Sequence, residues 1–212
     1  MTGIVDFGPE TFRANPEAAQ VFSTINRGWN HIVTEGGQDP GFVAVQYPDF
    51  CLSSMGEEVS CWSSGLEVIR LTAETNMGPD VILHEYGHAL MHYAFGQSPG
   101  GGDHSFADLE QDAGLAFSEG WATGFALSFC PDGVFNHQEW RYQDPAGGWP
   151  LCTAVNNAYG ESIEGFSFWN GQNRKGERHE GRVAAAITDF LDAPNDSNGG
   201  NEDLGKNGYE DT

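Results

Sequence analysis

The chain has few basic residues. Only 9 of its 212 residues are lysine or arginine, against 31 aspartates and glutamates, which gives a formal net charge of -22. Because such a surface repels phosphate groups, we expect neither nucleic acid nor an anionic membrane as a partner. The excess of acid is more typical of a solubilising surface or a saline habitat than of an acid-dependent function.

Long apolar runs and an export signal are also missing. No apolar segment approaches the ~20 residues that a membrane-spanning helix requires. The first residues, MTGIVDFGPE, have neither the basic stretch nor the apolar core of a signal peptide. With 39% hydrophobic residues, the composition is globular. We therefore expect a monomeric globular protein that does not insert into membranes, with no signal or pro-sequence within this chain.

The four cysteines do not form a CxxC motif. They fall into two pairs close in sequence, Cys51 with Cys61 and Cys130 with Cys152. Small loops closed by disulfides are typical of oxidising compartments, so we predict two local disulfides and an extracellular location. The alternative is four buried free thiols, because connectivity does not follow from sequence alone.

The hydrophobic pattern predicts a mixture of helices and short strands. Apolar residues at helical spacing indicate helices over residues 15–33, 79–95, 106–129 and 178–192. Residues 41–49 alternate like a strand, and residues 56–75 indicate a strand, a turn at 63–65 and a second strand. Residues 130–176 are rich in Pro, Gly, Asn and Trp and are expected to be mostly loop. The fold class is therefore α+β.

The segment DVILHEYGHALMH, residues 80–92, places two histidines four positions apart on one helix. Residues at this spacing project from the same face, so His84 and His88 can offer two ring nitrogens to one zinc ion, with Glu85 beside them as a base. The alternative is an ordinary pair of histidines at helical spacing. His92 lies two turns, ~12 Å, from His84 and is expected to serve packing or the surface.

A third ligand is expected on the next helix, in AFSEGWATGFAL. Glu119 stands there among small and apolar residues, where an unpaired carboxylate would be costly. Glycines inside a helix cost stability, roughly 1 kcal/mol each, so Gly120 and Gly124 indicate that the HExxH helix approaches closely and that a short carboxylate can reach the metal. We predict that Glu119 binds zinc; the alternative is a solvated glutamate on an exposed face.

These two segments resemble the gluzincins, the HExxH peptidases whose third zinc ligand is a glutamate on a later helix. The similarity is greatest to the fungalysin-like and thermolysin-like branches and covers roughly residues 17–192, with specific matches at VILHEYGHAL and FSEGWATGFAL. It implies a zincin-type catalytic domain over 1–192, with a helix-and-sheet upper lobe (about 1–98), a helical and loop lower lobe (about 99–192) and a cleft between them. It also implies an edge strand for an extended peptide, with Trp62 near the substrate.

The resemblance implies a secreted zinc endopeptidase that acts on peptides or proteins. Glu85 would be the general base, and His179 would donate to the oxyanion, with Arg182, Tyr159 and Tyr142 as alternatives. Those families have an aspartate four residues after the glutamate ligand, where this chain has Thr123. Asp112 or another acid is then expected to orient the zinc histidine.

Two rival functions are compatible with the sequence. The first is a secreted peptide-binding module that keeps the peptidase fold without turnover. The second is a zinc hydrolase acting on another amide or on a glycosylated substrate.

The acidic tail, residues 193–212, is expected to be either a calcium loop or a linker. Its start supplies hard oxygen ligands that calcium favours: Asp192, Asn195, Asp196 and Asn198. The spacing does not fit an EF-hand.

Overall fold

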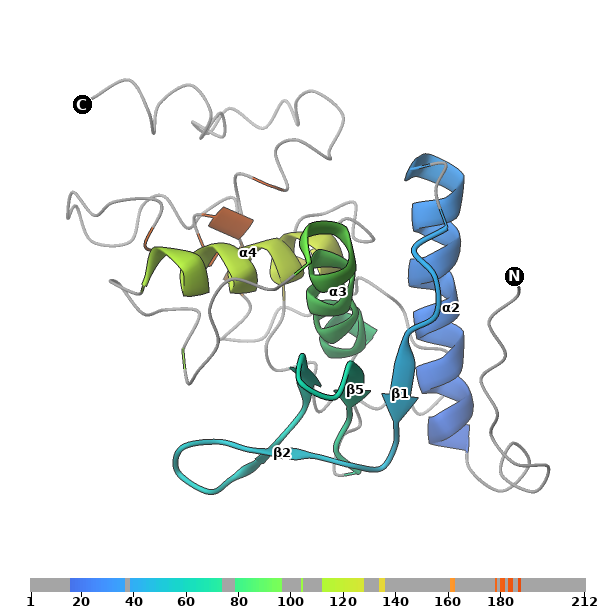
Figure 1. Cartoon of the computed structure of the whole chain (residues 1–212), viewed down its shortest axis with the longest axis horizontal. Helices are drawn as coiled ribbons and strands as arrows, with labels where there is room; N and C mark the ends of the chain where they lie inside the picture. The colour runs from blue at the N-terminus through green and yellow to red at the C-terminus, as the bar shows by residue number, and fades with distance from the viewer. Residues whose placement is uncertain are drawn as a thin grey trace. The chain divides into compact units, whose positions relative to one another are not determined.

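The computed structural model describes residues 16–36, 39–73, 79–96, 104, 112–127, 134–135, 161–162, 178, 180, 181, 183, 184 and 187. It divides the chain into two compact units. Unit 1 comprises residues 1–98 and 140–149, and unit 2 comprises residues 99–139 and 150–212. Both helices and strands are present, as the coloured segments of Figure 1 show.

A small mixed sheet forms the β part of unit 1. Its strands are β1 (Ala44–Gln46), β5 (Val68–Arg70) and β4 (Cys61–Ser63), in the order β1-β5-β4. β1 runs parallel to β5, whereas β4 is antiparallel to it. Ile69 lies opposite both Val45 and Trp62 and is fully buried, so the centre of β5 carries the core side of the sheet.

The single strand expected ahead of residues 63–65 is in fact two strands in different sheets. β3 (Glu58–Val59) pairs antiparallel with β2 (Cys51–Leu52), and β4 then pairs with β5. Ser60 separates β3 from β4, and its Oγ accepts a hydrogen bond from the Thr72 backbone N–H at 3.1 Å. This side-chain contact at the junction offers a local alternative to continuous strand pairing.

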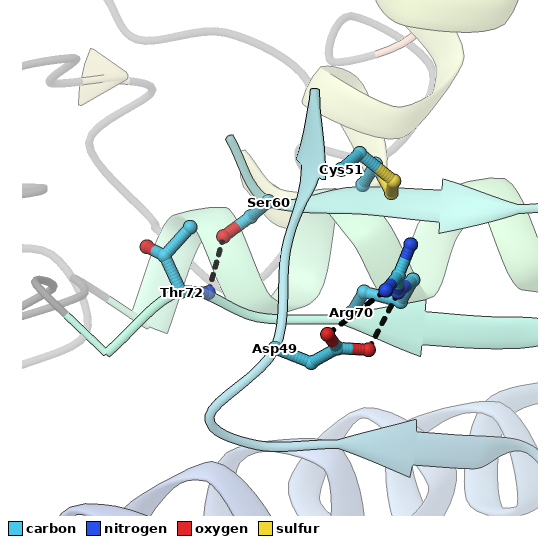
Figure 2. Close-up of a disulfide and its surroundings, with 6 residues drawn as sticks. Asp49, Cys51, Ser60, Arg70 and Thr72 are labelled. Carbon is cyan, nitrogen blue, oxygen red and sulfur yellow. Dashed lines mark hydrogen bonds and ion pairs between the residues drawn. A yellow bond between two sulfur atoms is a disulfide. The ribbon is translucent and has the colours of Figure 1, made fainter. Parts of the chain in front are cut away.

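Two cross-links hold this region together (Figure 2). The disulfide joins Cys51 to Cys61, with Cα atoms 6.0 Å apart, and confirms that predicted pairing. Cys130 and Cys152 lie outside the described residues. Arg70 donates two hydrogen bonds to Asp49, from Nε at 2.5 Å and from Nη2 at 2.9 Å, and these bonds hold the pKa of the Asp49 carboxyl below its ordinary value.

Two helices complete the described part of unit 1. α2 spans Pro16–Gly36 and α3 spans Pro79–Phe95, both beginning at the proline predicted for the first helical position. α3 contacts α2 as well as β4 and β5, and every residue from Pro79 to Met91 is buried. Burial on all sides is typical of a core helix rather than an amphipathic surface helix.

A glycine allows the close contact between α2 and α3. A Cβ atom at Gly28 would lie 2.9 Å from Cδ1 of Tyr86 and 3.1 Å from Cδ2 of Leu83, both fully buried side chains. The missing side chain of Gly28 therefore makes room for the Tyr86 ring. Burial also raises the pKa of the Tyr86 phenol well above its ordinary range.

The main helix of unit 2 is α4, Ala113–Leu127. The expected start near residue 106 is wrong, because Asp112 caps the helix: its Oδ1 accepts hydrogen bonds from the Gly114 and Leu115 N–H groups at 2.9 and 3.3 Å. Unit 2 also contains a short antiparallel pair, β6 (Val134–Phe135) with β7 (Glu161–Ser162).

The glycines of α4 receive a second helical segment of unit 2. Residues 180, 181, 183, 184 and 187 are helical. A Cβ atom at Gly120 would lie 2.5 Å from Cβ of Val183, and one at Gly124 would lie 2.7 Å from Cγ2 of Ile187. Gly120 and Gly124 therefore make room for this segment, whereas the sequence had indicated the HExxH helix as the partner.

None of the helices that the structure describes has the length and apolar character needed to cross a membrane.

Replacing Gly28 with alanine is expected to destabilise the protein. The added methyl group must displace the Tyr86 ring, and overpacking a core typically costs about 1–3 kcal/mol, which the better helix propensity of alanine offsets only in part. Ser23→Ala, at an exposed position of the same helix, is the control. Urea unfolding should give a lower midpoint for Gly28→Ala alone; an unchanged midpoint would mean that the ring moves without cost.

Disulfide mapping tests the cysteine pairing in the whole chain. Peptides from the non-reduced protein should contain Cys51 linked to Cys61, and the sequence predicts Cys130 linked to Cys152. Removing the first bridge as Cys51→Ser/Cys61→Ser should lower the unfolding free energy by about 2–3 kcal/mol, because the loop it closes is short. Alkylation of any of the four thiols in the native, non-reduced protein would contradict the pairing.

Candidate metal centre

The two histidines of the HExxH motif meet on α3. The Nε2 atoms of His84 and His88 lie 3.1 Å apart, with the ring centroids separated by 4.7 Å and the planes at 86°. Both residues are buried, at 8% and 7% exposure. One helical turn thus brings two ring nitrogens to a common point inside unit 1.

This spacing suits a shared metal ion. Two nitrogens bound at about 2.0–2.1 Å to a tetrahedral zinc ion lie roughly 3.3 Å apart, close to the observed separation. In the absence of a cation, one ring must donate its Nε2–H to the other, since two bare lone pairs at this distance repel. The pair therefore fits zinc in its geometry and in its donor atoms.

Glu85 lies next to the first histidine and is also buried, at 7% exposure. Its neighbours in sequence, His84 and Tyr86, are buried as well. Removing this carboxylate from water is costly, so its surroundings must offset the lost solvation. Its position on α3 is the one that the HExxH motif gives to a base.

Glu119 is a buried residue of unit 2. It lies on α4 with 5% exposure, between Ser118 and Gly120, and Ser118 is fully buried. The Nε2 atom of His104 lies 3.2 Å from its Oε2 atom. The same nitrogen is 3.8 Å from Oε2 of Glu180, whose exposure is 2%. A solvated surface position for Glu119 is therefore excluded.

Sequence reasoning missed Glu180. Val183 and Ile187, which contact α4, lie three and seven positions after Glu180. Residues at these spacings share one helix face, so Glu180 lies on the face that contacts α4. The contact of His104 with Glu119 was not predicted either, because a glycine-rich segment conveys no periodicity from which its position could be inferred.

The other residues of α3 and β4 near the motif form an aromatic group. The Trp62 ring lies 5.5 Å from the ring of His92 and 6.0 Å from that of Tyr93. His92 also lies 3.8 Å from the Glu67 carboxylate. His92 thus takes part in packing and lies close to the Glu67 carboxylate, while a substrate contact for Trp62 stays a prediction.

The remaining predicted site residues divide into two groups. Asp112 caps α4 and in that role engages backbone N–H groups, and Thr123 is fully buried on the same helix. The others lie outside the described residues: the oxyanion candidates His179, Arg182, Tyr142 and Tyr159, and the calcium candidates Asp192, Asn195, Asp196 and Asn198.

Comparison with known proteins gives one family match. Residues 53–210 match the model of the Mycolysin C-terminal domain, a domain of fungalysin/thermolysin-like peptidases. The matched range contains His84, Glu85, His88 and Glu119. The search of curated proteins and the search of solved structures find no match. Because the matched range covers well over half of the chain, this protein belongs to the Mycolysin C-terminal domain family.

Proposed function

We propose that this protein is a secreted zinc-dependent endopeptidase of the gluzincin type. The observation that carries the proposal is the buried pair of Nε2 atoms of His84 and His88, 3.1 Å apart, with the buried Glu85 between them in sequence. The family match supports a metallopeptidase context. The corresponding fold would be a zincin-type α+β fold.

His84, His88 and Glu119 would hold the zinc ion. Two neutral imidazoles and one carboxylate are a donor set found in catalytic zinc sites, which keep a fourth position open. The burial of Glu119 supports this role, because a carboxylate removed from water requires compensation. When bound, zinc would lower the pKa of a water molecule and polarise the scissile carbonyl.

Glu85 would move the proton. As the general base it would accept a proton from the attacking water and then deliver it to the leaving amine of the peptide. It does not need to bind the metal for this role, because as the residue after His84 it projects about 100° further round the helix. A donor for the oxyanion, for which His179 and Arg182 are the candidates, would complete the site.

The surroundings suggest where such an enzyme acts. The Cys51–Cys61 disulfide is typical of an oxidising compartment. Mycolysin-related domains belong to secreted peptidases. We therefore propose extracellular peptides or proteins as substrates.

A non-catalytic peptide-binding module is the second candidate. The observation in its favour is the description of the matched family as a C-terminal domain rather than as a catalytic domain. Such a module would keep the fold and the metal without turnover. In such a module Glu85 has no catalytic role, so the two candidates differ in whether the protein hydrolyses peptides.

Metal analysis tests the proposed ligands. The protein should bind about one zinc per chain, and His84→Ala or Glu119→Ala should weaken the zinc Kd by more than the 10–100-fold that loss of an outer-shell partner costs. His92→Ala is the matched control, because this histidine lies on the same helix but outside the pair. Full zinc binding by Glu119→Ala would refute the gluzincin ligand set and direct attention to His104.

A substitution of the base separates enzyme from binding module. Glu85→Gln keeps the shape of the side chain and removes its basicity, so zinc binding should persist while casein hydrolysis falls by about 10²–10⁴-fold. Zinc content and hydrolysis rate are measured on the same preparations. A wild-type protein that binds zinc yet cleaves no peptide in a broad library would favour the module, and an unaltered rate in Glu85→Gln would overturn the mechanism.

A further inference from the structure

We infer that His104 is a positioning residue that fixes the carboxylate of Glu119 as a metal ligand, and that Glu180 holds His104 in place. The inference rests on the proposed function for the identity of the ligand. It is drawn wholly from contacts within unit 2.

The contacts converge on one ring nitrogen. Nε2 of His104 lies 3.2 Å from Oε2 of Glu119 and 3.8 Å from Oε2 of Glu180. An ionised carboxylate can only accept hydrogen bonds, so Nε2 must carry the hydrogen at its 3.2 Å contact with Glu119. This holds for the neutral ring and for the charged ring alike. At 3.8 Å the Glu180 oxygen is beyond hydrogen-bond reach and acts on this N–H group by electrostatic attraction. His104 is thus a donor aimed at the carboxylate that we assign to zinc.

Burial of the two glutamates makes a hydrogen-bond donor beside them energetically important. The two glutamates are 5% and 2% exposed, whereas the His104 side chain is 27% exposed. Two buried carboxylates close to one imidazole repel each other, and an N–H group between them offsets part of that repulsion. Hydrogen bonds of this kind are worth more in a dry interior than in water.

The contact also restricts the carboxylate. With Oε2 of Glu119 held close to His104, the carboxylate has a defined orientation in which to bind a metal. Outer-shell partners of this type typically contribute 10–100-fold to metal affinity.

A close backbone contact between α4 and the segment around Glu180 explains why Glu180 lies near Glu119 and His104. Gly120, the residue after the ligand, has no side chain, and a Cβ atom there would lie 2.8 Å from the carbonyl oxygen of Glu180 and 2.5 Å from Cβ of Val183. The Glu180 backbone therefore rests on α4 one residue from Glu119. Glu119 thus supplies the proposed metal ligand, and Gly120 leaves room for the backbone of Glu180.

The experiment compares metal affinity across matched variants. His104→Ala should raise the zinc Kd about 10–100-fold. His104→Gln, which keeps an N–H donor at a similar reach, should restore the Kd to within about threefold of wild type. His92→Ala is the control, because His92 forms a second histidine–glutamate pair at 3.8 Å in unit 1 and should leave the Kd unchanged.

A spectroscopic measurement separates positioning from a merely structural role. The visible absorption bands of the cobalt-substituted protein report the ligand geometry, so they should change in His104→Ala and return in His104→Gln. Far-UV circular dichroism of the metal-free variants should match wild type. Wild-type affinity together with wild-type cobalt bands in His104→Ala would overturn the inference.

A double substitution tests the part played by Glu180. Glu180→Gln should weaken zinc binding about tenfold, at the lower end of outer-shell effects. In a His104→Ala background the same change should have no further effect, because Glu180 acts through the imidazole. An equal effect in both backgrounds would overturn this part of the inference.

Zinc binding by the variants distinguishes a failure of this inference from a failure of the proposed function. If His84→Ala and Glu119→Ala lose zinc while His104→Ala does not, the zinc site stands and the positioning role fails. If wild-type protein binds no zinc, or Glu119→Ala binds it fully, the proposed function fails first. If His104→Ala and His104→Gln lose zinc equally while Glu119→Ala retains it, His104 itself is the ligand and the inference is wrong.

Discussion

Removing an ionisable side chain from water costs several kcal/mol unless other groups replace the water. Six carboxylate or imidazole residues among the described part of the chain are at most 8% exposed: Asp80, His84, Glu85, His88, Glu119 and Glu180. Four of them lie on α3 and the other two lie in unit 2 beside His104. Each of them therefore needs polar partners or a bound ion to offset the loss of water.

Glycine at helix contacts makes these arrangements possible. Gly28 lets the Tyr86 ring of α3 lie against α2, which fixes the helix that carries both histidines. Gly120 lets the Glu180 backbone approach α4 beside Glu119. In both cases a glycine that weakens its own helix lies where a side chain would displace the neighbouring segment, the Tyr86 ring in one case and the Glu180 backbone in the other. The cost in helix propensity is thus linked to the candidate metal centre.

The family match and the side-chain geometry address different questions. Membership of the Mycolysin C-terminal domain family places the chain among domains of fungalysin/thermolysin-like peptidases. It does not by itself assign turnover, which belongs to specific groups on the fold. The buried HExxH pair and its adjacent glutamate are the groups that give the enzymatic proposal its physical content, and Glu85 is the one among them that a binding module would have no need to keep.

The sequence by itself determined the elements whose signals are local. Pro79 and Gly96 bound α3 because a fixed φ suits a helix start and a positive φ suits its end, and the four-residue spacing alone puts His84 and His88 on one face. The Cys51–Cys61 pair was predicted from proximity in the chain, which favours a local bridge without fixing the connectivity. The start of α4 is also set locally, because Asp112 caps the helix through the N–H groups two and three residues after it, and the apolar pattern from residue 106 extended the expected helix too far. Only the tertiary structure decided that the chain changes sheets at Ser60, and that His104 lies close to both Glu119 and Glu180, since contacts between residues 12 to 76 positions apart leave no periodic trace in a single sequence.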